Sequence, residues 1–244
     1  MIFKTLVNKL LCRVLPNIKY LPQSKFRTCG ICLKPSLFIS LSEGEEVKLC
    51  IWCRANLRYE MLAEYLRLIC PDLRNLTVLE IGPSSPLSPL LANSNKYIPT
   101  YFSPIDKPGS IRYDGVQCED ITKLTLEDNS IDIIISSDVL EHVPDIKAAF
   151  RETKRVLRQG GFHLFTVPPR DKTIKRAEIN DKGKICHLTE PDYHSDPLNP
   201  KGILAFWDFG VDAIQLFAME GLEITIVSGP KGKDQRIVWK ALKI

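Results

Sequence analysis

The stretch IDIIISSDVLEHVPD, from Ile131 to Asp145, decides the fold of this chain. Its first seven residues are mostly apolar, although Asp132 interrupts them, and such a run is typical of a strand buried on both faces of a sheet. Residues 144–157 then show the spacing of an amphipathic helix with a proline in its first turn, and a Gly-Gly pair follows. A second apolar run covers residues 162–167 and ends at two prolines. The order strand, helix, strand predicts parallel strands joined by a crossover helix.

Similar patterns on both sides of this unit extend it to a seven-stranded sheet. The predicted strands cover residues 78–81, 97–102, 116–119, 131–137, 162–167, 222–227 and 236–242. Helical spacing occurs at residues 54–69 and 211–220, whereas residues 170–207 are rich in loop formers and predict a long insertion. Turn-forming residues join the last two strands, so the sheet is expected to end in an antiparallel pair. The chain is therefore predicted to have an α/β fold, with helices on both faces of a mostly parallel sheet.

Four of the eight cysteines form the pattern Cys29-x2-Cys32-x17-Cys50-x2-Cys53. Each Cys-x-x-Cys pair fits a tight turn that directs two thiolates toward one ion, and this spacing is typical of a closed, structural zinc site. Two disulfides, or four unrelated buried thiols, are the alternatives. The residues between the pairs predict a hairpin, and a module this small needs metal to supply its folding energy. The remaining cysteines have no partner spacing and are interpreted as ordinary thiols: Cys12, Cys70, Cys118 and Cys186.

The N-terminal segment combines apolar positions at helical spacing with basic residues. The apolar positions are Phe3, Leu6, Val7, Leu10, Leu11 and Val14, and the basic residues are Lys4, Lys9 and Arg13. The basic residues interrupt each stretch that would serve as the core of an export signal, so we expect a cytoplasmic protein without disulfides. We interpret residues 1–25 as an amphipathic helix with a linker, packed on the rest of the protein or on a second copy. Peripheral membrane contact through residues 1–20 is the alternative.

Charge is unevenly distributed along the chain. Residues 1–60 hold ten basic and four acidic side chains, whereas the remaining 184 residues hold 23 and 25. The front of the protein is therefore expected to meet an anionic partner, RNA or membrane, unless it is only a solvated basic face.

A turn rich in proline and serine follows the first predicted strand. It reads Gly82-Pro-Ser-Ser-Pro86 and comes directly after Glu80 and Ile81. The carboxyl end of a parallel strand is where an open α/β sheet binds a nucleotide-like ligand, and glycine lets the backbone approach that ligand. With a single glycine, the turn lacks the Gly-x-Gly-x-x-Gly pattern of dinucleotide-binding enzymes, which disfavours a nicotinamide or flavin cofactor.

Taken together, these motifs resemble a known enzyme family. VLEIGP at residues 78–83, the run from Asp128 to Asp145 and RVLRQGG at residues 155–161 are closely similar to class I, type 11-like S-adenosylmethionine-dependent methyltransferases. The resemblance covers roughly residues 76–168. It implies a Rossmann-like seven-stranded sheet whose seventh strand is antiparallel, and S-adenosylmethionine as the cofactor.

The resemblance also implies a set of cofactor-binding residues, carried over by position. Asp120 matches the acid that hydrogen-bonds the adenine amino group, Ile121 lies beside the ring, and Ser137 lies under the transferable methyl group. The family usually ends its second strand with an acid that holds the ribose hydroxyls. Here that place reads Thr-Tyr-Phe at residues 100–102, and Asp106 is the substitute. The full predicted set is Glu80, Gly82, Pro83, Ser84, Asp106, Asp120, Ile121 and Ser137.

Three histidines are the candidate catalytic residues. His142 follows the fourth strand and is a candidate general base, with capping or orienting of its turn as the alternative. His187 and His194 lie in the insertion, which is expected to cover the carboxyl ends of the strands and bind the methyl acceptor, unless it is a plain surface loop. The spacing Asp138-x-x-Glu141-His142 resembles that of a few methyltransferases that bind a divalent cation, and magnesium or manganese would suit it.

The predicted function is methyl transfer to an oxygen or nitrogen atom of a small-molecule or sugar-like acceptor. The sugar-like acceptor rests on a similar loop in family members from surface-polysaccharide gene neighbourhoods. The alternatives are an RNA methyltransferase whose basic zinc module contacts RNA, and a non-catalytic zinc-containing interaction protein with a degenerate methyltransferase fold. The expected domains are residues 1–25 (helix and linker), 26–56 (zinc module) and 57–244 (methyltransferase, with the insertion at 170–207). The acceptor and the oligomeric state stay open.

Overall fold

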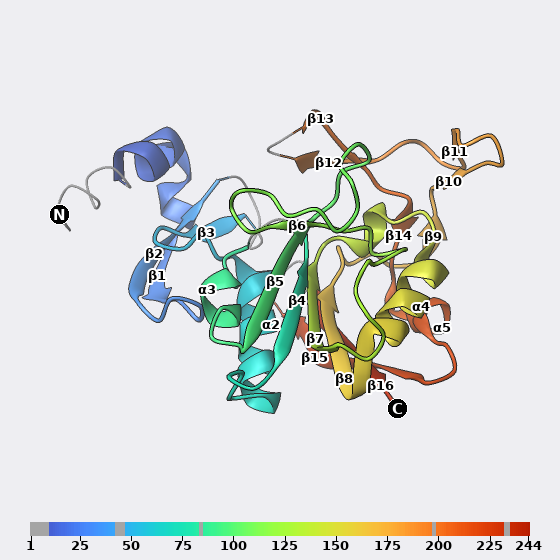
Figure 1. The fold of residues 1–244 in the computed structure, drawn as a ribbon. Helices are drawn as coiled ribbons and strands as arrows, with labels where there is room; N and C mark the ends of the chain where they lie inside the picture. The colour runs from blue at the N-terminus through green and yellow to red at the C-terminus, as the bar shows by residue number, and fades with distance from the viewer. Residues whose placement is uncertain (1–9, 42–46, 83–84, 197–198, 232–234) are drawn as a thin grey trace.

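The computed structural model describes residues 10–41, 47–82, 85–196, 199–231 and 235–244 (Figure 1). Its N-terminal part is a small antiparallel sheet with the order β1-β2-β3. The three strands are β1 (Lys25–Thr28), β2 (Pro35–Ser40) and β3 (Lys48–Cys50). The pairing of β2 with β3 confirms the hairpin expected between the two cysteine pairs.

The segment before this sheet is not one regular α-helix. A π-helical turn, η1 (Leu10–Val14), is followed by a 3-10 helix, η2 (Leu15–Gln23), which contains two prolines. Proline removes backbone donors and blocks a continuous α-helix, which accounts for the difference from the prediction. Val14 is buried in a small cluster with Ile39 and Ile51, so this part of the segment packs on the protein. The predicted apolar positions 3, 6 and 7 lie outside the described residues.

The second sheet has seven strands in the order β15-β16-β8-β7-β4-β5-β6. They are β4 (Thr77–Ile81), β5 (Lys96–Tyr101), β6 (Gln117–Cys118), β7 (Ile131–Ser137), β8 (Leu157–Thr166), β15 (Leu222–Lys231) and β16 (Arg236–Lys243). The pairs from β6 to β8 are parallel, and β16 is antiparallel to both β8 and β15. Because β16 lies between β8 and β15, the last strand in sequence is inserted into the sheet and does not form its edge. The predicted mostly parallel sheet with an antiparallel last strand is therefore confirmed.

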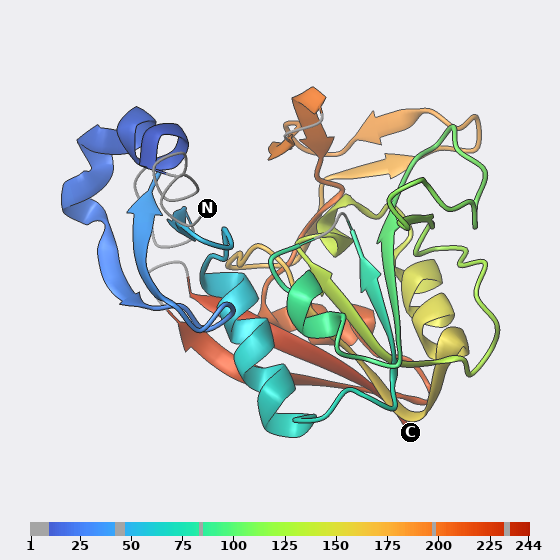
Figure 2. The same ribbon diagram turned by 60° about the vertical axis from the view of Figure 1, so that its left-hand side comes forward.

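Helices cover both faces of this sheet. They are α2 (Leu57–Ile69), α3 (Ser88–Leu91), α4 (Ile146–Val156) and α5 (Ile214–Phe217), with short 3-10 turns η3 (Leu140–His142) and η4 (Val211–Ala213). Figure 2 shows α2 and α4 on opposite sides of the strands. Successive side chains of β7 alternate between the two faces: Ile133 and Ile135 belong to the core under α2, and Ile134 belongs to the core under α4. Alternation with apolar residues on both faces is why this stretch reads as a continuous apolar run.

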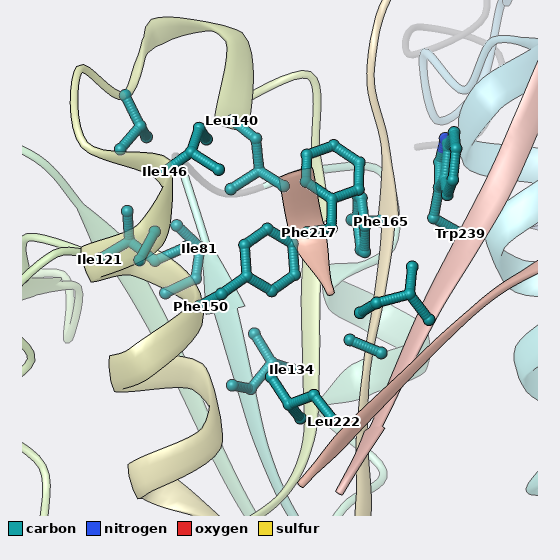
Figure 3. Packing of buried hydrophobic residues seen from close by; sticks show 14 of the residues in the cluster. Ile81, Ile121, Ile134, Leu140, Ile146, Phe150, Phe165, Phe217, Leu222 and Trp239 are labelled. Atoms are coloured by element: carbon teal, nitrogen blue, oxygen red, sulfur yellow. The ribbon is translucent and has the colours of Figure 1, made fainter. Parts of the chain in front are cut away.

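Aromatic side chains fill the core between the sheet and the helices α4 and α5. Phe150 of α4 stacks on Phe217 of α5 with 5.0 Å between ring centroids. Phe217 in turn meets Phe165 of β8 and Trp239 of β16 edge-on. Figure 3 shows these rings beside Ile134 and Leu222. The antiparallel strand β16 is thus fastened to the parallel part of the sheet through this aromatic cluster.

Three expectations for element boundaries were wrong. Helix α4 begins at Ile146 because the Asp145 side chain caps it by accepting a hydrogen bond from the Ala148 amide at 2.9 Å, so Pro144 precedes the helix. Strand β8 begins directly at Leu157, and the expected Gly-Gly turn is part of that strand. The helix expected over residues 211–220 is limited to η4 and α5, because the backbone is extended again at Ala218.

The insertion at residues 170–207 contains three small two-stranded sheets. They pair β9 (Ile174–Lys175) with β14 (Trp207–Asp208), β10 (Ala177–Ile179) with β11 (Ile185–His187), and β12 (Tyr193–Asp196) with β13 (Asn199–Leu204). Such short strands are too brief to give a periodic signal, and the sequence therefore indicated only a loop. Among the described helices, none is long and apolar enough to cross a membrane.

The buried histidine of β8 makes stability depend on pH. Burial lowers the pKa of His163 to about 3, and its ring Nε2 lies 2.8 Å from Ser136 Oγ. The unfolded chain binds a proton at this histidine below about pH 6.5, whereas the folded chain does not until about pH 3, so stability falls as the pH drops through that window. Through His163, the unmodified protein should lose about 2 kcal/mol of stability between pH 7 and pH 5. We expect His163→Gln, which keeps a hydrogen-bonding group, to abolish this part of the loss.

Urea unfolding at both pH values measures this effect. His187→Gln is the matched control, because His187 is exposed on β11 and should leave the pH dependence unchanged. The same pH dependence in His163→Gln and in the unmodified protein would contradict the assignment.

Candidate active site

The first loop of the sheet begins with a buried acid and a glycine of special geometry. The Glu80 carboxylate accepts hydrogen bonds from the hydroxyls of Ser85, Ser88 and Tyr97, and burial raises its pKa. Gly82 has φ of +111°, which disfavours any side chain, and a Cβ there would lie 3.4 Å from Val139. Glu80 therefore supports the loop through hydrogen bonds to Ser85 and Ser88, and the half-buried Gly82 directly follows β4. Of the predicted set, Pro83 and Ser84 lie outside the described residues.

The ends of β5 and β6 carry the predicted adenosine-binding acids. Asp106 is exposed, and its Oδ2 accepts a hydrogen bond from the Tyr101 hydroxyl at 3.0 Å. Asp120 is half-buried, and its Oδ1 accepts from the Thr122 amide at 2.8 Å and the Thr122 hydroxyl at 2.7 Å. Ile121 beside it is buried. These contacts hold both carboxylates at the carboxyl ends of adjacent strands, where the resemblance places the adenosine.

Beyond β7, the structure shows an ion cluster that sequence reasoning missed. The Asp138 carboxylate accepts from Arg58 of α2 at 2.6 Å and from Arg236 of β16 at 2.8 Å. The preceding Ser137 lies 3.3 Å, Oγ to Oγ1, from Thr166 of β8. Neither arginine belongs to a motif, so no signal in the sequence pointed to this cluster. Asp138 is therefore neutralised by two guanidinium groups, and it does not belong to the group of potential metal ligands formed by Glu141, His142 and His194.

A second group joins the turn η3 to the insertion. Glu141 and His142 of η3 lie together with His194 of β12, and their ligand atoms are all within 4.8 Å of one another. The two imidazole rings meet edge-on, with 5.0 Å between centroids. Burial raises the pKa of Glu141, and the nearby Glu141 carboxylate raises the pKa of His194. The sequence suggested Asp138, Glu141 and His142 as ligands of a divalent cation. In the structure, His194 takes the place of Asp138 in this group.

The third candidate histidine is elsewhere. His187 is exposed on β11, where it pairs with Ala177 of β10, and it is not part of the Glu141 group. The fold thus separates His187 on β11 from His194 on β12, although the two histidines are close in sequence. A hollow of about 370 Å³ lies between the start of α4 and the insertion, lined in part by Ile146, Lys175 and Trp207. None of the predicted cofactor residues lines it.

The four predicted zinc ligands converge in the N-terminal module. The sulfur atoms of Cys29 and Cys53 are 3.6 Å apart, and those of Cys32 and Cys50 are 3.8 Å apart. A tetrahedral zinc ion with Zn–S bonds of about 2.3 Å separates its sulfurs by about 3.8 Å, whereas a disulfide needs about 2.0 Å. The donor set and its spacing therefore fit zinc, and the disulfide alternative does not fit this geometry.

Comparisons with known proteins match parts of this sequence. Residues 104–165 match a family model described as a methyltransferase domain. An uncharacterized protein of Methanocaldococcus jannaschii, MJ0638, is 36% identical over 81 residues, which is 32% of this chain and 35% of that protein. The alignment with this curated relative thus spans about a third of the relative's length.

This chain is similar to solved structures of two bacterial proteins. A candidate S-adenosylmethionine-dependent methyltransferase of Listeria monocytogenes is 15% identical, with a TM-score of 0.51, over 76% of this chain and 99% of that one. An S-adenosylmethionine-dependent methyltransferase of Mesorhizobium loti is 17% identical, with a TM-score of 0.49, over 74% of this chain and 97% of that one. The chain thus matches a methyltransferase-domain model over residues 104–165, and its seven-stranded sheet has the fold of the Listeria monocytogenes protein.

Proposed function

We propose that the protein transfers the methyl group of S-adenosylmethionine to an oxygen or nitrogen atom of a small-molecule or sugar-like acceptor. One observation carries the acceptor side of this proposal: His194, from the insertion, lies against Glu141 and His142 directly after β7. In an open α/β sheet, this end of the strands faces the ligand crevice. The insertion thus contributes a polar side chain at the place where an acceptor would approach the cofactor.

Methyl transfer requires little of the protein beyond the positioning of the cofactor and the acceptor. The bound cofactor supplies an electrophilic methyl group on a sulfonium, which becomes a neutral thioether on transfer. Gly82, Asp106, Asp120 and Ile121 would hold the adenosine and methionine parts along the ends of β4, β5 and β6, and the insertion would orient the acceptor. His142 and His194 are the candidate groups to take the proton that an oxygen or nitrogen acceptor releases.

We also infer that Cys29, Cys32, Cys50 and Cys53 bind one structural zinc ion. Four thiolates fill a tetrahedral shell and leave no position for a substrate. The module packs on α2, because Glu60 accepts hydrogen bonds from the Gly30 amide and from Arg27, both at 2.7 Å. Zinc would thus stabilise the surface on which the first helix of the methyltransferase domain rests.

Calorimetric titration of the zinc-loaded protein with S-adenosylhomocysteine tests the cofactor site. We expect a micromolar dissociation constant, about tenfold weaker in Asp120→Ala because a hydrogen bond to a charged group is lost. Binding should be lost in Gly82→Arg, which places a long side chain on the loop that approaches the cofactor.

Two matched controls are available in the hairpin of β10 and β11. Gly183→Arg introduces the same side chain at another glycine of positive φ, with open space around it, and should leave binding unchanged. The exposed Asp181 is the control for Asp120, as Asp181→Ala. A folded protein that does not bind S-adenosylhomocysteine would contradict the proposal and favour the non-catalytic alternative, whereas binding justifies an acceptor screen that begins with glycans.

A further inference from the structure

Glu141 has a buried carboxylate whose desolvation is not offset by hydrogen bonds from the described residues. Its side chain is only 1% exposed. Among the described residues, no hydrogen-bond donor reaches either carboxylate oxygen. Burying a carboxylate costs several kcal/mol unless a cation or donors offset the cost. We therefore expect a bound ion or ligand, which the polypeptide itself does not supply, to interact with this carboxylate.

The two nearest ionisable groups are imidazoles that point at the same oxygen. His194 Nδ1 lies 3.6 Å from Glu141 Oε1, and His142 Nε2 lies 3.7 Å from it. These distances are too long for hydrogen bonds. They are close to the roughly 3.0 to 3.4 Å that separates ligand atoms bound to one ion at about 2.1 Å. A small inward movement of the side chains would bring all three onto a common ion.

An outer partner already orients the His142 ring for this role. His142 Nδ1 lies 2.9 Å from the Leu204 carbonyl oxygen, which can only accept, so the proton is on Nδ1 and the Nε2 lone pair faces Glu141. His194 Nε2 lies 3.7 Å from Asp192 Oδ2, on the far side of the ring from Glu141. Histidine ligands in metal sites commonly have their second ring nitrogen hydrogen-bonded to a carbonyl or carboxylate, as His142 has with Leu204.

We propose that Glu141, His142 and His194 bind a divalent first-row transition-metal ion. Two imidazoles and one carboxylate suit such ions better than magnesium or calcium, which prefer oxygen ligands throughout. Three protein ligands leave coordination positions open, so the site is of the kind that can also bind a small ligand. The nearby carboxylate of Asp138 does not compete for the ion, because Arg58 and Arg236 hold it.

Such an ion would also connect the insertion to the sheet. His194 and Leu204 lie on the paired strands β12 and β13, while Glu141 and His142 follow β7. Two hydrogen bonds already connect these parts: the Phe206 amide donates to the Glu141 carbonyl at 2.7 Å, and His142 Nδ1 bonds to the Leu204 carbonyl at 2.9 Å. Metal binding would therefore order the part of the insertion that faces the proposed acceptor.

Cobalt binding by the full-length, zinc-loaded protein tests the proposal. Calorimetric titration with Co²⁺ should reveal one binding equivalent with a micromolar dissociation constant, without the thiolate charge-transfer absorption of cobalt in a cysteine site. His194→Ala and Glu141→Gln should each weaken this binding by at least about tenfold. His187→Ala is the matched control, because it removes an exposed histidine of the same insertion and should leave binding unchanged.

Two results would overturn the proposal. One is the absence of cobalt binding in a protein that circular dichroism shows to be folded. The other is binding that persists unchanged in both His194→Ala and Glu141→Gln, which would place the ion elsewhere. The proposal goes beyond the proposed methyl transfer and is tested separately, because the same samples can be titrated with S-adenosylhomocysteine. If the ion binds, both histidines are ligands, and neither serves as the proton acceptor.

Discussion

Replacing Cys50 with serine is expected to release the inferred zinc ion and unfold the module of β1, β2 and β3. The apolar core of this module is small, and its cysteines are part of it: Cys29, Ile31, Phe38 and Cys50 are all buried. Structural zinc supplies about 10–16 kcal/mol in such modules, more than a core of this size can replace. We expect zinc content to fall from one ion per chain to none.

Hydrogen exchange followed by mass spectrometry measures the structural result. Amide protection should be lost in β1 to β3 and reduced in α2, because Glu60 and Arg67 of α2 bond to the turn at Gly30 and Ile31. Cys118→Ser is the matched control: this buried cysteine lies outside the cluster and should retain the zinc. Unchanged protection in a zinc-free Cys50→Ser protein would show that the module folds without metal.

Replacing Asp138 with asparagine is expected to lower the free energy of unfolding by about 3–5 kcal/mol. The Asp138 side chain is 11% exposed and the Arg236 side chain is 8% exposed, so the substitution leaves two guanidinium groups facing each other with little solvent. Asparagine preserves the shape of the side chain and tolerates the positive φ of 53° at this position. The loss of stability therefore measures the effect of removing the negative charge.

Urea unfolding measures this loss. Arg151→Ala removes an exposed ion pair with Asp145, at 3.8 Å, and should cost less than about 1 kcal/mol. If Asp138→Asn were as mild as this control, the cluster would be unimportant for joining α2 and β16 to the end of β7.

Much of the scaffold was predictable because its signals are local. The strand Ile131–Ser137 was predicted with the bounds that the structure has, since a strand buried on both faces needs a mostly apolar run. Pro99 did not prevent β5, which pairs with β4 through that region. The cysteine pairs were equally clear, because each Cys-x-x-Cys turn is set by four consecutive residues.

The ends of the helices and the insertion were harder. Helix α5 stops after Phe217 although the apolar spacing continues, because the chain must turn there to enter β15. The strands of the small sheets in the insertion are only two to six residues long, and their pairing depends on contacts with the rest of the fold.

By itself, the sequence determined the order of the main strands and helices, because periodicity is a property of neighbouring residues. From short spacings it also predicted the cofactor-binding edge of the sheet and the four zinc ligands. Only the tertiary structure decided which distant side chains meet. It placed Arg58 and Arg236 on Asp138, brought His194 to Glu141, and left His187 on an exposed hairpin. Residues so far apart along the chain come together through the packing of whole elements, and no local pattern records that packing.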